Sequence, residues 1–132
     1  MLEGRQEFSL ALSPCKKFVF AFGGFSQSAN TCLTTIEKYT VATDTWQTLT
    51  TQLDTPLKAT AVATMPDGIY LMGGFDSTSQ TFSKRVFRLT LTNESDEVDL
   101  QDMAAMKVAR SAFTACPTST CGYIYVVGGQ TT

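Results

Sequence analysis

The stretch Phe18-Val19-Phe20-Ala21-Phe22-Gly23-Gly24 decides the fold, because it recurs twice more along the chain in altered form. An apolar run followed by two glycines is found again at 69–74, which is IYLMGG, and at 123–129, which is YIYVVGG. The second glycine of each pair is Gly24, Gly74 or Gly129, so the steps between units are 50 and 55 residues. A fixed period of this length indicates a repeat architecture. We therefore predict three units, which span 5–57, 58–109 and 110–132.

A cationic residue marks the start of each unit, at Arg5, Lys58 and Arg110. Phe8 and Phe113 each follow three residues after the arginine of their unit. We expect the three cations to occupy equivalent places.

The local patterns within a unit predict short β-strands. In the first unit, residues 8–13, 34–41 and 45–50 alternate apolar and polar side chains, and 18–22 is a nearly continuous apolar run. Turn-forming stretches such as Ser13-Pro14 and Thr43-Asp44 separate these segments. Four strands per unit follow, and no segment shows a sustained helical period.

The order of residues in the first unit resembles the kelch repeat. Gly23-Gly24 is followed after fourteen residues by Tyr39, and after six more by Trp46. In the second unit Gly73-Gly74 is present, Leu89 takes the place of the tyrosine, and Val98 is the expected substitute for the tryptophan. The third unit ends soon after Gly128-Gly129. The resemblance implies an all-β fold, a kelch-type β-propeller fragment with four-stranded antiparallel blades, two complete and one half.

Elementary packing physics favours the same fold. A blade buries both faces of its inner strands against neighbouring blades, which favours aromatic and branched residues there. A glycine pair fits where the chain turns close to another segment, because glycine has no Cβ. We expect Tyr39 and Trp46 to pack between blades.

Strand count indicates an incomplete ring. A propeller needs at least about four blades to close, and these residues supply two and a half. We expect a piece of a longer propeller; the alternative is a short protein that assembles with other chains. Either way, the isolated chain is expected to associate or to need the missing blades. The second unit's period is five residues longer than the first. We expect these extra residues to lie in the acidic turn 93–97.

Composition excludes several classes of function. The chain has 10 Lys and Arg against 12 Asp and Glu, and no basic run that would follow a phosphate backbone. Its longest apolar runs have five residues, whereas about 20 are needed to cross a bilayer. No secretory leader is visible at the start. We therefore expect neither a nucleic acid nor a membrane partner, and a cytoplasmic location that includes cytoskeletal or nuclear sites.

The chain offers no convincing catalytic or metal-binding set, and we predict no cofactor. It has no histidine, the most common general base and metal ligand. Thr43-Asp44-Thr45-Trp46 has only a superficial likeness to the Asp box of sialidase propellers. An acidic group could hold Ca²⁺, but a solvated loop explains it better; its members are Glu94, Asp96, Glu97, Asp99 and Asp102.

The cysteines are expected to be free thiols. Cys116 and Cys121 bracket a predicted hairpin turn, so a disulfide across that turn is conceivable. Free thiols are the normal state in a reducing compartment.

Two classes of function remain. The favoured one is a protein-binding scaffold or adaptor that recognises its partner through loops on one propeller face. The alternative is part of a propeller enzyme, oxidase or sialidase-like, whose catalytic residues lie outside this chain. The loops after the glycine pairs are long and polar, as recognition loops on rigid scaffolds are. The predicted contact residues are Gln27, Asn30, Asp76, Ser77 and Gln80, with Phe25 and Phe75 as possible anchors and Lys16, Lys17 and Asp44 on the opposite side.

Overall fold

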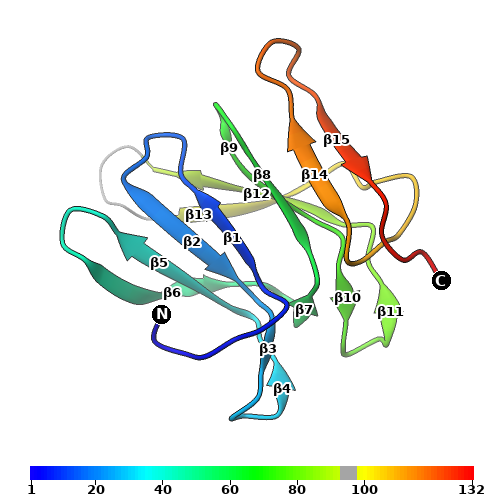
Figure 1. Ribbon diagram of the computed structural model, residues 1–132, viewed down its shortest axis with the longest axis horizontal. Coiled ribbons are helices and arrows are strands. Elements are labelled where there is room, and N and C mark those ends of the chain that lie inside the picture. The colour runs from blue at the N-terminus through cyan, green and yellow to red at the C-terminus, as the bar shows by residue number, and fades with distance from the viewer. Residues whose placement is uncertain (93–97) are drawn as a thin grey trace.

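The fold is built from antiparallel β-sheets that are arranged as a fan (Figure 1). A computed structural model describes residues 1–92 and 98–132. The expected acidic turn at 93–97, with Glu94, Asp96 and Glu97, lies outside the described residues. Within the described ranges all regular structure is β-strand, which confirms the predicted all-β class.

The first two units each form a four-stranded antiparallel sheet, as the sequence predicted. Blade 1 has the order β1-β2-β5-β6, with β1 (Ser9–Leu12), β2 (Phe18–Phe22), β5 (Thr35–Thr40) and β6 (Thr45–Gln52). Blade 2 has the order β8-β9-β12-β13, with β8 (Ala61–Met65), β9 (Gly68–Met72), β12 (Val86–Leu91) and β13 (Val98–Met103). The third unit is the hairpin of β14 (Thr114–Pro117) and β15 (Ile124–Val127).

Two small hairpins lie between the second and third strands of the complete blades. The first is β3 (Phe25–Ser26) with β4 (Thr31–Cys32), and the second is β10 (Phe75–Asp76) with β11 (Thr81–Phe82). β10 also pairs with β7 (Leu57–Lys58), the segment that enters blade 2. Both hairpins project from the same side of the fan, at the bottom of Figure 1.

The main core fills the space between the two complete blades. Strand β2 directs Phe18, Phe20 and Phe22 toward blade 2, where Ile69 and Leu89 belong to the same buried cluster. A smaller cluster, which includes Met72 and Phe113, joins blade 2 to the hairpin of the third unit. The near-continuous apolar run at 18–22 is explained by this two-sided burial, because no residue of β2 is fully exposed.

The opposite face of blade 1 carries Tyr39 and Trp46. These residues face each other across β5 and β6, with ring centroids 5.2 Å apart, and Val19 is the partner of Tyr39 in β2. In blade 2 the matching position is Leu89, which is buried against blade 1. Tyr39 and Trp46 therefore occupy positions that in blade 2 pack against the preceding blade. In the described residues, no blade covers this face of blade 1.

Each glycine of the first pair lies close to a different segment, and a side chain at either position would clash with that segment. A Cβ on Gly23 would lie 2.4 Å from the Leu57 carbonyl oxygen, which belongs to the segment entering the next blade. A Cβ on Gly24 would lie 2.7 Å from Gln6 O and from Phe8 Cβ, at the start of its own unit. The first glycine thus admits the neighbouring blade and the second admits the unit's own first segment. Both have positive φ, which other residues rarely adopt.

Hydrogen bonds and glycine contacts correct the predicted place of Lys58. Gly24 N donates to Leu57 O, and Gly74 N donates to Arg110 O. Leu57 is therefore the equivalent of Arg110, and Lys58 lies one residue further along. A slip of one residue in a strand reverses the side to which a side chain points. The cationic start of each unit thus holds for Arg5 and Arg110 but not for Lys58.

Strand pairing also corrects the expected substitute for tryptophan in blade 2. Tyr39 pairs with Trp46 in blade 1, and Leu89 pairs with Leu100 in blade 2. Val98 pairs with Leu91 instead. Leu89 in the tyrosine place is confirmed, whereas the tryptophan place belongs to Leu100.

A buried ion pair secures the first unit. Arg5 Nη2 lies 3.3 Å from Glu37 Oε1, and both side chains are at most 1% exposed. Arg5 Nη1 also donates to Gly23 O at 2.9 Å, as Arg110 Nη1 does to Gly128 O at 2.7 Å. Glu37 accepts the backbone N–H groups of Leu2 and Glu3. The opposite charges and these hydrogen bonds together offset the cost of removing two ions from water.

Candidate partner-binding surface

Two hairpins and the strand between them form the surface on which the predicted contact residues lie. The hairpins are β3-β4 and β10-β11, and β7 enters between them by pairing with β10. Pro56 O accepts a hydrogen bond from Ser77 N at 3.2 Å, so the segment before β7 lies against the second hairpin. We call this surface the loop face.

Lys58 is the centre of the loop face. Its Nζ lies 5.9 Å from the ring centroid of Phe25 and 6.0 Å from that of Phe75, so one ammonium contacts an aromatic ring on each hairpin. Nζ also pairs with Glu7, at 3.1 Å from Oε2. The Lys58 side chain remains partly exposed. This arrangement offers a partner a cation between two rings, a combination that can contact both acidic and apolar groups.

The sequence did not identify Lys58 as a site residue. It was assigned to the start of a repeat, and its true neighbours depend on the pairing of Lys58 with Phe75 across β7 and β10. Phe25 and Phe75 are half-buried, and Phe75 also contacts Phe82 at a centroid distance of 5.9 Å. The rings therefore combine packing with exposure.

Three of the predicted contact residues form bonds within their own hairpin. The Asp76 carboxylate accepts the N–H of Thr78 at 2.8 Å and that of Ser79 at 3.3 Å. Gln80 Nε2 donates to Ser77 O at 2.6 Å. Asp76 and Ser77 are half-buried, whereas Gln80 is exposed. These contacts shape the β10-β11 loop and set which of its groups face outward.

Gln27 and Asn30 lie in the first hairpin and are exposed. Asn30 and Gln80 occupy matching turn positions, each five residues after the phenylalanine, and both have positive φ, 51° and 55°. Gln27 lines a hollow of about 270 Å³ together with Gly4, Arg5, Gln6 and Phe25. The loop face thus includes a concave part beside the first hairpin.

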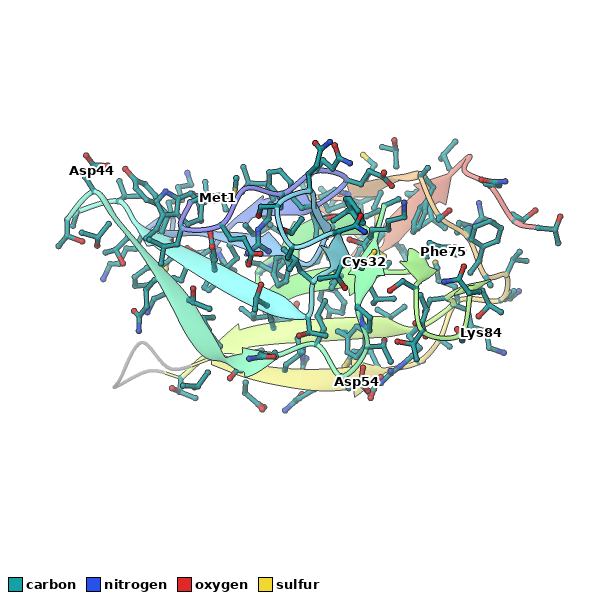
Figure 2. All side chains as sticks on the ribbon, turned by 90° about the horizontal axis from the view of Figure 1, so that it is seen from below. Met1, Cys32, Asp44, Asp54, Phe75 and Lys84 are labelled. Atoms are coloured by element: carbon teal, nitrogen blue, oxygen red, sulfur yellow. The ribbon has the colours of Figure 1, made fainter. Side chains whose placement is uncertain are left out.

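The opposite end of the blades carries the residues proposed as the contrast. Lys16 and Lys17 lie in the β1-β2 turn and line a shallow hollow with Val41, while Asp44 lies in the nearby β5-β6 turn. Asp44 accepts a hydrogen bond from the Tyr39 hydroxyl at 2.8 Å. Figure 2 shows Asp44 at one end of the molecule, well away from Phe75.

All four cysteines are free thiols in the described residues. Cys116 pairs across the hairpin with Tyr125, so Cys116 and Cys121 do not face each other across the strands. Cys15 lies in the β1-β2 turn, where a hydrogen bond with the Ser13 hydroxyl lowers the pKa of its thiol, assisted by the Lys17 backbone.

In the described residues, histidine, cysteine and acidic side chains form no group of three that could hold a metal ion. Asp99 and Asp102 are the only members of the proposed acidic group that are described. The same residues contain no helix long and apolar enough to span a membrane.

Comparison with known families identifies one motif in the chain. A family model described as the kelch motif matches residues 19–52, which run from β2 through β6 of blade 1. The match includes Gly23-Gly24, Tyr39 and Trp46, the residues on which the resemblance was based. A search of curated proteins gives no match.

Proposed function

We propose that this chain, which carries a kelch motif in its first blade, is a protein-binding scaffold or adaptor module whose loop face recognises the partner. The observation that carries the proposal is the position of Lys58 between Phe25 and Phe75. A partly exposed cation over aromatic rings, set on rigid strands, is suited to recognition rather than to packing alone.

The partner-binding residues in this proposal are the exposed side chains around that centre. Gln27, Asn30 and Gln80 present amide groups at the tips of the two hairpins. Asp76 and Ser77 act mainly by holding the second loop in shape. Such loops bind without large rearrangement when internal bonds preorganise them.

Binding is favoured over catalysis by the chemistry of the loop face. Its polar groups include amides, hydroxyls, the Asp76 carboxylate and the Lys58–Glu7 pair, and the chain has no histidine to act as a base. Free thiols at the four cysteines are typical of a reducing compartment. A cytoplasmic location, with cytoskeletal and nuclear sites included, is part of this proposal.

The proposal is tested by comparing two faces of the same chain. The tagged chain, a loop-face variant with Gln27, Asn30, Lys58 and Gln80 changed to Ala, and an opposite-end variant with Lys16, Lys17 and Asp44 changed to Ala are used to capture proteins from a cell lysate. A partner that is then purified should bind the opposite-end variant as tightly as the unchanged chain and the loop-face variant at least tenfold more weakly, about 1.4 kcal/mol. If the opposite-end variant binds at least tenfold more weakly and the loop-face variant binds as tightly as the unchanged chain, the wrong face was chosen.

A further inference from the structure

A groove runs along the outer rim of the fan, between the outermost strands of blades 1 and 2. It encloses about 240 Å³. One wall is the end of β6, Thr51 and Gln52, and the other is the start of β13, residues 98–100. Thr51 Oγ1 donates to Val98 O at 3.3 Å and ties the two walls together. This rim groove is formed by different residues from the loop face.

Part of the lining of the rim groove is apolar. Phe87 is buried in the main core, and Val98 and Leu100 are partly buried against the same cluster. Val98 and Leu100 leave an apolar surface that water contacts. Covering such a surface is favourable, by about 25 cal/mol for each Å² removed from water.

Carboxylates surround this apolar lining. Asp54 and Asp102 belong to the groove, and none of the groove's lining residues is a lysine or an arginine. Asp99 lies on the opposite face of β13 from Val98 and Leu100, where its carboxylate accepts a hydrogen bond from Gln101 Nε2 at 2.8 Å. Arg85 pairs with Asp54 at 2.7 Å and with Asp102 at 2.8 Å. Two carboxylates against one guanidinium leave a formal charge of −1. The Asp54 and Asp102 side chains are 57% and 62% exposed, so they can accept further hydrogen bonds. Figure 2 shows Asp54 at the margin of the molecule.

Both walls are also free sheet edges. β6 ends the sheet of blade 1 and β13 ends the sheet of blade 2, so in the described residues no strand pairs with the outer edge of either. A free edge presents unpaired backbone groups, which an extended segment of another chain can use. An edge beside an apolar groove therefore favours an extended occupant.

The contacts of Arg85 show which side chains can bind an apolar surface beside carboxylates. Its guanidinium carbon lies 4.5 Å from the ring centroid of Phe87 while its nitrogens contact Asp54 and Asp102. A cation on an aliphatic stem thus satisfies the apolar and the acidic parts together. Lysine and arginine are the residues that combine a long stem with a charged end.

We propose that the rim groove between β6 and β13 docks an extended segment of a protein partner in which lysine or arginine alternates with apolar residues. The stems and apolar side chains cover Val98 and Leu100, and the cations face Asp54 and Asp102. This second binding surface does not depend on the function proposed for the loop face.

The test uses the whole chain and three short fluorescent peptides of equal length. The first alternates lysine with valine, the second has glutamate in place of lysine, and the third has serine in place of valine. Fluorescence anisotropy should show saturable binding of the first peptide and much weaker binding of the other two. The affinity should also fall as salt is raised, because the screening length shortens from about 30 Å at 0.01 M to about 8 Å at 0.15 M.

A charge-matched pair of variants locates the binding on the chain. Asp54→Asn with Asp102→Asn should weaken binding of the lysine peptide about fivefold for each carboxylate lost, as expected for contacts at about 4 Å in water. Glu3→Gln with Asp44→Asn removes the same charge away from the groove and should leave binding within about twofold of the unchanged chain. Circular dichroism should confirm that both variants are folded.

Several results would overturn the proposal. One is the absence of binding by the lysine–valine peptide to the unchanged chain. Another is equal binding by the serine peptide, since that would mean that only charge is recognised. A third is equal weakening in the two charge-matched variants. If the groove variant fails to fold, the peptide series and its salt dependence on the unchanged chain still decide.

Discussion

Replacing the first glycine of a pair by alanine should be costly where a following blade is present and mild where it is absent. Gly23 and Gly128 are equivalent residues of the first and third units, and both have positive φ, 52° and 77°. A Cβ on Gly23 would lie 2.4 Å from Leu57 O, whereas a Cβ on Gly128 would meet nothing within 4 Å. The two substitutions therefore share a backbone penalty and differ in the steric one.

The structure sets the size of the difference. The shared term, an L-residue held at positive φ, is about 1–2 kcal/mol. At Gly23 the added methyl must also displace the Leu57 carbonyl, which accepts the hydrogen bond of Gly24 N. Overpacking costs about 1–3 kcal/mol, and a weakened buried hydrogen bond costs about 1 kcal/mol more. We expect about 3–6 kcal/mol for Gly23→Ala and about 1–2 kcal/mol for Gly128→Ala.

Equilibrium urea unfolding of the two variants and of the unchanged chain, followed by circular dichroism, measures the difference. With a slope of about 1–3 kcal/mol per molar urea, the midpoint of Gly23→Ala should fall by about 1 M or more relative to Gly128→Ala. Equal midpoints for the two variants would refute the assignment of the first glycine to interblade contact. A larger loss for Gly128→Ala would show that Gly128 is covered by a segment that packs like the next blade.

Three further predictions concern the buried ion pair, the Cys15 thiol and the exposed face of β15. Arg5→Met should lower the free energy of unfolding by about 3–5 kcal/mol, because it leaves the Glu37 carboxylate buried without its cation; a urea titration that shows less than about 1 kcal/mol would contradict this. Ser13→Ala should move the pH dependence of Cys15 alkylation to higher pH, since the Ser13 hydroxyl lowers the pKa of this thiol, while the alkylation of Cys116, followed by mass spectrometry as the control, should not change. The isolated chain should associate through the uncovered face of β15, where Tyr125 and Val127 are 60% and 68% exposed, so Tyr125→Glu with Val127→Glu should lower the molar mass in light scattering; a monodisperse monomer of the unchanged chain would contradict this.

Much of the fold was predictable because its signals are local. The apolar run at 18–22 and the glycine pair after it recur at a fixed period, and a strand's alternation depends only on its own residues. Leu89 in the tyrosine place also followed from counting, because the stretch from Gly74 to Leu89 has the same length as that from Gly24 to Tyr39. Counting residues from the glycine pair predicts an equivalent position wherever no segment of variable length lies in between.

Counting failed where a turn of unknown length or a choice between adjacent residues had to be resolved. Leu100 rather than Val98 takes the tryptophan place, because the register of β13 is set by its pairing with β12 beyond the acidic turn. Leu57 rather than Lys58 matches Arg5 and Arg110, although charge alone pointed to the lysine. A side chain's charge does not reveal the face on which the backbone places it.

The sequence by itself determined the repeated units, their strands, the glycine pairs and the polar hairpins after them. Tertiary structure alone decided which side chains meet. It set Lys58 between the rings of two hairpins, used Asp76 to hold its own loop, and brought β6 and β13 together at an acidic rim. The physical reason is that strand propensity and turn chemistry act over a few residues, whereas these contacts join residues tens of positions apart and exist only once register and blade packing are fixed.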